Sequence, residues 1–202
     1  MKSSPCSPAL ALSSLLGVLA LALGATTTAR ADAGFQFGFW APDLQIVEAT
    51  ENVRGLRINI VYGENANVSG ADFGIVNSTT DDFVGFGWAP GANLVGGTTT
   101  GVQWSWIFSH TAGEFTGWQS AIVARIDGGG SSGLQTGLVT LSEGDFTGAQ
   151  IGFFNKGNTV KGLQLGLVNW AERLDGGLQI GLVNYAANSD VYKILPIVNW
   201  QF

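Results

Sequence analysis

A pattern of eight residues recurs along this chain at a nearly fixed spacing, and that repetition limits the folds the chain can adopt. Residues 162–169 read GLQLGLVN and residues 177–184 read GLQIGLVN. Repetition of this kind is typical of proteins in which one structural unit stacks on copies of itself. Related copies, spaced 14–16 residues apart in the later part of the chain, predict about eleven units, which begin at residues 34, 55, 70, 85, 101, 117, 133, 148, 162, 177 and 192.

Each unit alternates between two kinds of side chain. In the unit that begins at Gly162, Leu163, Leu165 and Leu167 fall on one side of an extended chain, and Gln164 falls on the other. Alternation with a period of two is typical of a β-strand, and the connectors are rich in turn-forming Asn, Asp, Gly, Ser and Thr. The 30 glycines disfavour helices, because glycine costs about 1 kcal/mol at a helical position. The sequence therefore predicts a single all-β repeat domain over residues 34–202.

The uniform direction of the pattern favours a β-solenoid, in which equal residues of successive coils stack about 4.8 Å apart. The longer first unit, 34–54, and the ending that contains Pro196 are the candidate caps of such a stack. We expect the return side of each coil to be filled by Phe83, Phe115, Phe146 and Val160. We expect an amide ladder at one corner from Asn77, Asn155, Asn169, Asn184 and Asn199. A repeated turn that tolerates Asn would produce the same column without a ladder.

An antiparallel β-barrel of the outer membrane is the alternative. A tilted strand of about nine residues spans such a membrane, and the chain ends in Phe202 with Trp200 and Val198 on the same face. Against the barrel, the connectors are similar in length, whereas barrels alternate short turns with longer outer loops. Antiparallel neighbours would also give no reason for every strand to carry the pattern in the same direction.

The apolar face of the units is expected to be covered, either by side chains in a solenoid core or by lipid around a barrel. Trp104, Trp106 and Trp118 lie on this face in neighbouring units. Their alternation with Gln103 and other polar residues predicts a bulky layer of the core. The alternative is an exposed platform that contacts sugars or lipid.

The first 33 residues are predicted to be a cleaved signal peptide. Lys2 precedes a 15-residue apolar segment, residues 9–23, which is too short for a comfortable membrane span. Two small-x-small cleavage sites follow and predict a mature start at Asp32 or Gly34. Cys6 is the only cysteine and precedes the apolar segment, so we expect neither disulfides nor thiolate metal sites in the mature domain.

From Gly34 onward the chain keeps seven cationic and 14 acidic residues, for a net charge of −7. No run of basic residues is present, so nucleic acid is not an expected partner. Attraction to anionic lipid headgroups is not expected either. A partner in the outer membrane or elsewhere in the envelope remains compatible with this composition, and the sequence does not identify a small-molecule ligand.

The sequence predicts no catalytic, cofactor-binding or metal site. His110 is the only histidine, and its neighbour Ser109 faces the opposite way on a strand, so the two cannot act together. Paired carboxylates such as Glu143 and Asp145 are candidates for acid/base hydrolysis, and connector carboxylates are also candidate Ca²⁺ ligands. No connector matches a calcium-binding loop, and solvated turns are the favoured interpretation of Asp81, Asp82, Glu114, Glu143, Asp145, Glu172, Asp175 and Asp190.

Four stretches resemble the surface repeat-containing proteins of bacteria, which are exported and uncharacterised. They read GLRINIVYGENANVSGADFGIVNSTTDDFVG, GEFTGWQSAIV, GLQLGLVNWAERLDGGLQIGLVNYA and PIVNWQF. The resemblance covers residues 34–202, except that the copy beginning at Gly85 departs from the pattern. It implies a cell-surface or envelope location, with the periplasm as a further option, and brings no catalytic residue. The expected function is a non-enzymatic surface protein with a structural or adhesive role; the alternative is a small pore or anchor built as an outer-membrane barrel.

Overall fold

A computed structural model describes residues 32–190 and 192–201, and the regular elements of these residues are all strands. The predicted signal peptide lies outside the described residues except for its last two positions, and the first strand begins at Asp32. The strands are β1 Asp32–Trp40, β2 Leu44–Gln45, β3 Asn52–Asn65, β4 Val68–Thr79, β5 Phe83–Ala89, β6 Ala92–Val95, β7 Thr99–Ser105, β8 Phe108–Thr111, β9 Phe115–Ser120, β10 Val123–Ile126, β11 Ser131–Thr136, β12 Val139–Ile151, β13 Phe154–Leu165, β14 Val168–Leu174, β15 Gly177–Ala186 and β16 Ile194–Gln201.

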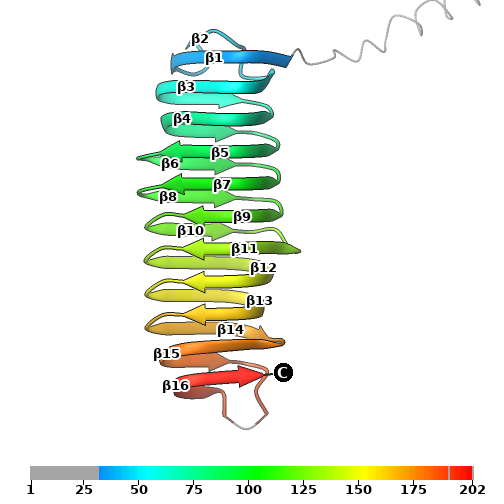
Figure 1. The fold of residues 1–202 in the computed structure, drawn as a ribbon, viewed down its shortest axis with the longest axis vertical. Helices are drawn as coiled ribbons and strands as arrows, with labels where there is room; N and C mark the ends of the chain where they lie inside the picture. The colour runs from blue at the N-terminus through cyan, green and yellow to red at the C-terminus, as the bar shows by residue number, and fades with distance from the viewer. Residues whose placement is uncertain (1–31, 191, 202) are drawn as a thin grey trace, which may run out of the picture. The chain divides into compact units, whose positions relative to one another are not determined.

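Successive repeats lie side by side as parallel strands, with equal residues in register (Figure 1). Gly148 is opposite Gly162 and Gln150 is opposite Gln164, for example, between β12 and β13. The fold is a β-solenoid of about nine turns, as predicted. The barrel alternative is wrong, because neighbouring repeats run in the same direction.

Each turn contains a long side and a short side. In the turn that begins with β7, the long side is Thr99–Ser105 and the short side is β8, and each pairs with the same side of the next turn. Toward the C-terminus the two sides merge, so that β12 forms the short side of one turn and the long side of the next. The copy that begins at Gly85 also forms a regular turn from β5 and β6, although its sequence departs from the pattern.

The first and last repeat copies do not form full turns, which corrects the prediction of about eleven units. β1 runs parallel to β3, but the chain then folds back as the short antiparallel β2. The last copy, which contains Pro196, forms β16 and runs antiparallel to β15. These strands occupy the two ends of the stack, where caps were expected (Figure 1).

The inside of the stack is built around a column of glutamine side chains. Each glutamine is fully or almost fully buried, and from Gln119 onward its Nε2 donates a hydrogen bond to the Oε1 of the glutamine in the preceding turn at 2.7–3.0 Å. Asn199 of β16 closes the column by donating to Gln179 Oε1 at 2.9 Å. The glutamines of this ladder are Gln103, Gln119, Gln135, Gln150, Gln164 and Gln179. Buried amides are tolerated here because the next turn satisfies each of them.

The glutamines also connect the two sides of a turn. The second Nε2 hydrogen of Gln164 points to the carbonyl of Trp170 at 3.3 Å, and Gln179 reaches the carbonyl of Tyr185 at 3.0 Å. Both residues contacted lie on the short side, six positions after the glutamine. Each glutamine therefore stabilises both the stacking between turns and the closure of its own turn.

The predicted asparagine ladder is confirmed for Asn155, Asn169 and Asn184. Asn155 donates to Asn169 Oδ1 at 2.8 Å, and Asn169 donates to Asn184 Oδ1 at 2.7 Å. Asn77 bonds instead to Asn93, which the prediction omitted. The placement of Asn199 in this ladder is wrong, because the reversed direction of β16 carries it to the glutamine column. The asparagines donate toward the C-terminus and the glutamines toward the N-terminus, so the two ladders run in opposite senses.

A column of apolar side chains fills the other inner corner. The prediction that these residues fill the return side of each coil is confirmed, since all are at most 2% exposed. They form small clusters with neighbours such as Ile126 and Leu174. The predicted members are Phe83, Phe115, Phe146 and Val160.

The two glycines of the repeat are required by backbone geometry. Gly162 has φ of +119°, in the region that favours glycine, and a Cβ there would lie 2.2 Å from the carbonyl oxygen of Gly148. At the corner, a Cβ on Gly166 would lie 2.1 Å from the carbonyl oxygen of Gly152. Both glycines therefore allow successive turns to approach closely.

Candidate functional site

The apolar face of the repeats points outward, which corrects the prediction that it forms the core. The outward side chains are those one, three and five positions after the first glycine of each repeat, and they form three columns along the stack. We call this surface the apolar belt. Its members that are at least a third exposed are Phe35, Phe37, Phe39, Leu56, Ile60, Phe73, Ile75, Phe86, Trp104, Trp106, Trp118, Ile122, Leu138, Ile151, Phe153, Leu165, Leu167 and Leu182. We include Trp200 of the antiparallel β16, which pairs with Leu178 and extends the first column.

The three tryptophans predicted to be a core layer belong to this belt. Trp104 and Trp118 come from neighbouring turns, and their rings stack with centroids 6.4 Å apart. Trp106 lies at the corner and meets Trp88 edge-on. Their neighbours Gln103 and Gln119 are inside, so the alternation itself was predicted correctly and only the side that faces solvent was reversed.

The belt is large and uncharged. Ten strands about 4.8 Å apart and three columns about 6.7 Å apart give it dimensions of about 45 Å by 13 Å, on the order of 600 Å². Typical monomers expose at most 300–600 Å² in their largest apolar patch, and such patches are commonly interaction sites. Across the described turns, the polar positions in the belt are small hydroxyls, and Thr136 already accepts a hydrogen bond from Trp118 Nε1 at 3.1 Å.

The third column lies at the corner between the long and short sides, and it is the most prominent part of the belt. Backbone hydrogen bonds join its members in successive turns, from Ile122 to Trp106 at 2.8 Å and from Leu138 to Ile122 at 3.0 Å. Trp106 and Phe153 are both 59% exposed. Because the chain turns here, the belt wraps a convex edge, and it continues onto the short side through a column that includes Val168.

Shallow apolar grooves run along this corner in the C-terminal half. One has a volume of about 410 Å³ and lies between the side chains of Leu138 and Leu167 over Gly152. A second, of about 250 Å³, continues from Leu167 toward Ile197. Glycine forms the floor of both, since the corner glycines leave room that a larger side chain would fill.

Inside the N-terminal turns, the glutamine column is replaced by an ion pair. Arg57 and Asp72 occupy the glutamine positions of their turns and meet in a bidentate contact, with Nε–Oδ1 at 2.8 Å and Nη2–Oδ2 at 2.7 Å. Both are essentially fully buried. Arg57 also donates to the carbonyl of Ser78 at 2.8 Å. The charges are therefore neutralised and hydrogen-bonded, as burial requires.

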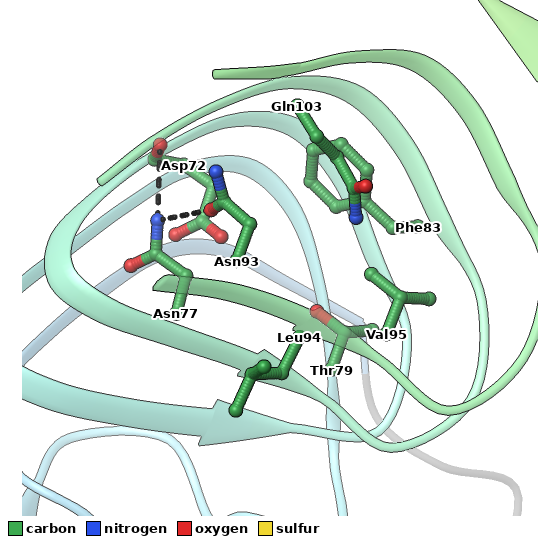
Figure 2. Close-up of a pocket in the computed structure, with 8 residues that line it drawn as sticks. All are labelled: Asp72, Asn77, Thr79, Phe83, Asn93, Leu94, Val95 and Gln103. Carbon is green, nitrogen blue, oxygen red and sulfur yellow. Dashed lines mark hydrogen bonds between the residues drawn. The ribbon is translucent and has the colours of Figure 1, made fainter. Parts of the chain in front are cut away.

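Gly87 follows in this column and leaves a gap between Asp72 and Gln103. The gap has about 160 Å³ of space between atoms, distributed so that no water-sized sphere fits. Figure 2 shows it, with Asn77 hydrogen-bonded to the carbonyl of Asp72 and to Asn93. A cavity of this size is a packing gap in the core and offers no room for a ligand.

His110 takes part in a surface ion-pair cluster. Its Nε2 lies 3.0 Å from Asp127 Oδ2, and Arg125 Nε lies 2.6 Å from Asp127 Oδ1. Burial alone would raise the pKa of Asp127, but the hydrogen bonds from His110 and Arg125 outweigh it and hold the pKa below its usual value. Ser109 points into the core, where its Oγ lies 2.9 Å from that of Ser105. The structure thus separates His110 from Ser109, as the alternation predicted.

The connector carboxylates lie mainly on the side of each turn opposite the belt corner. Glu143, one of the hydrolysis candidates, lies 3.5 Å from Lys156, and Asp175 lies 3.2 Å from Lys161. Asp82 accepts hydrogen bonds from the backbone and hydroxyl of Thr98. Among the described residues, no group of three or more His, Cys, Asp or Glu is placed to hold a metal ion.

Comparison with known proteins adds no relative: no protein family, curated protein or solved structure matches the chain. In the residues that the structure describes, no helix is both long and apolar enough to cross a membrane.

Sequence reasoning missed the orientation of the faces and the buried ion pair. The sequence did contain a signal for the orientation of the faces. Glutamine recurs two positions after the first glycine in most units, while the flanking apolar residues vary among Leu, Ile, Trp, Ala and Phe. A side chain that bonds to its own copy in the next turn must stay the same, whereas an outward residue need only be apolar. No signal of that kind marks Arg57 and Asp72.

Proposed function

We propose that this protein is an exported, non-enzymatic component of the cell envelope, with a structural or adhesive role that it performs through the apolar belt. The observation that carries the proposal is the belt itself, an uncharged apolar surface repeated in every turn. A soluble protein gains nothing from exposing so many large apolar side chains to water, and their burial against a partner is worth about 25 cal/mol per Å².

The rest of the chain supports the same proposal. Polar residues of the types that enzymes use take part in structural contacts, such as the His110–Asp127 pair and the Arg57–Asp72 pair. The predicted signal peptide agrees with export, and the resemblance to bacterial surface repeat-containing proteins agrees with an envelope location. A stack of similar turns is a rigid scaffold, and in the C-terminal turns it is fixed by two amide ladders.

Fractionation of bacterial cells that express the full chain tests the proposal. The corner variant, Leu138→Ser with Leu167→Ser, changes two belt residues. The control variant, Leu94→Ser with Leu141→Ser, changes two residues of the short side, in a column that also carries Arg125. We expect the wild type and the control variant in the envelope fraction after a high-salt wash, and the corner variant in the soluble periplasmic or secreted fraction.

Two results would contradict the proposal. If the protein is found unprocessed in the cytoplasm, the proposal that it is exported is wrong. If the corner variant is retained as well as the wild type, the belt is not the attachment surface. Circular dichroism of all three proteins shows whether a change of fraction reflects a loss of fold.

A further inference from the structure

Resting on the proposed function, we infer that the partner of the apolar belt is the hydrocarbon region of a lipid layer, on which the solenoid lies with its belt corner inserted. The belt is a surface that no part of the described chain covers. Its chemistry, its shape and the placement of charge each bear on what covers it.

The chemistry of the belt differs from that of a protein–protein interface. Such interfaces carry about one hydrogen bond per 100–200 Å², and their polar groups fix the orientation of the partner. A belt on the order of 600 Å² would then need several free donors and acceptors. Its Trp118–Thr136 hydrogen bond is internal, and its other exposed members are hydrocarbon except for the indole N–H groups of Trp104, Trp106 and Trp200, which can donate but not accept. Hydrocarbon requires no such partners.

The shape of the belt also favours lipid. Its corner is convex, so a rigid protein partner would need a matching concave surface, whereas acyl chains rearrange around any contour. The grooves between Leu138 and Leu167 and between Leu167 and Ile197 adjoin each other along the stack. They are open and apolar, which suits the passage of an acyl chain along the corner.

Charged side chains lie outside the three columns of the belt. Glu143 pairs with Lys156 of the short side, and Asp175 pairs with Lys161, which directly precedes the first glycine of its repeat. Interfacial amphipathic elements have the same division, with an apolar side buried about 5–10 Å into the acyl boundary and a charged side in water. The acidic net charge gives no attraction to anionic headgroups, so binding should depend on hydrocarbon contact and not on salt.

Tryptophan quenching by brominated phosphatidylcholine vesicles tests the inference. All seven tryptophans lie after residue 31, so the signal reports on the repeat domain and not on the leader. Full-length wild type and the control variant should be quenched to the same extent in low and high salt. The corner variant should lose half or more of that quenching. The leader is common to all three proteins, so the difference between them isolates the corner.

Three results would overturn the inference. The first is no quenching of the wild type, and the second is binding only to anionic vesicles with strong loss in high salt. The third is a wild-type dimer in sedimentation that the corner variant abolishes without any quenching, which would assign the belt to a second copy of the chain. If the vesicle experiment fails but the wild type is retained in the envelope fraction of cells, the proposed function is still supported and only lipid is excluded as the partner.

Discussion

Adjacent residues Gln164 and Leu165 should differ sharply in their effect on stability, in the order opposite to their hydrophobicity. Gln164 is fully buried, and Leu165 is 40% exposed. In Gln164→Leu the size of the side chain is almost unchanged, but three hydrogen bonds are removed. These are the bond to Gln150 at 2.8 Å, the bond to the carbonyl of Trp170 at 3.3 Å and the bond from Gln179 at 2.7 Å.

The magnitude follows from the groups left without a partner. Gln150 Oε1 and the Trp170 carbonyl lose a donor, whereas Gln179 keeps its bond to the carbonyl of Tyr185. Each unsatisfied buried group costs about 1–3 kcal/mol, and the buried leucine returns about 1–2 kcal/mol. Two such groups cost about 4 kcal/mol at the middle of that range, so the net loss should be about 2–3 kcal/mol. Leu165→Thr places a β-branched residue, which suits a strand, at a half-exposed position and should cost about 1 kcal/mol or less.

Urea denaturation followed by tryptophan fluorescence measures both changes. Midpoints and slopes are compared between the two variants and the wild type, so that a change in the unfolded state is recognised. A larger loss of stability in Leu165→Thr than in Gln164→Leu would contradict the assignment of the two faces. That result would place the leucine in the core and the glutamine outside.

Three further predictions concern the ion pair, the repeat and the surface cluster. Asp72→Gln leaves Arg57 buried without its counter-charge and should cost about 3–5 kcal/mol in urea denaturation. The double variant with Arg57→Gln should recover most of that loss, because two glutamines restore the ladder at these positions. No recovery would contradict the view that Arg57 and Asp72 occupy glutamine positions of the column. Deletion of residues 162–176 should preserve the circular dichroism spectrum and cooperative unfolding, because it removes one whole turn and keeps register. Deletion of residues 162–168 removes half a turn and should abolish both. Equal damage from the two deletions would contradict stacked turns. The lowered pKa of Asp127 means that its ionised form stabilises the fold above the unfolded pKa of about 3.9. This contribution is lost as pH falls through the lower pKa of the folded state. The melting temperatures of the wild type and Asp127→Asn should therefore converge in acid, and a constant difference across that range would contradict the ion-pair cluster at Asp127.

Much of the fold could be predicted from the repeat alone. The alternation around Gln164 predicted strands, and the constant direction of the pattern predicted parallel coils in place of an antiparallel barrel. The apolar residues of the connectors, such as Phe115, and the asparagine ladder from Asn155 were also predicted correctly. These features depend on the order of residues within one unit and on the regular spacing of units, both of which are visible in the sequence.

The inward and outward faces could not be assigned in this way, because a period of two defines two faces without saying which one is buried. The usual preference for apolar residues inside fails here for a physical reason. A turn of 14–16 residues encloses a narrow interior, in which a buried amide finds its partner in the next turn at the strand spacing of about 4.8 Å. Stacking therefore satisfies Gln164 inside, and Leu165 is left outside.

The end of the chain shows a second limit of prediction from the sequence pattern. Residues 192–199 match the repeat, yet β16 runs antiparallel to β15. The pattern records which residues alternate, and an antiparallel strand alternates in the same way. Only the pairing shows that Asn199 joins the glutamine column and bonds to Gln179. Local pattern thus predicts a strand at this end but not its direction.

Thiol labelling across one repeat shows which side chains of the strand face solvent and which lie inside the solenoid. In a Cys6→Ser background, single cysteines are placed at Leu163, Leu165, Gln164 and Asn169, and the folded protein is exposed to a water-soluble maleimide. We expect fast labelling at the two leucine positions and protection at the glutamine and asparagine positions. Protection of the leucine positions with fast labelling of the glutamine position would contradict it.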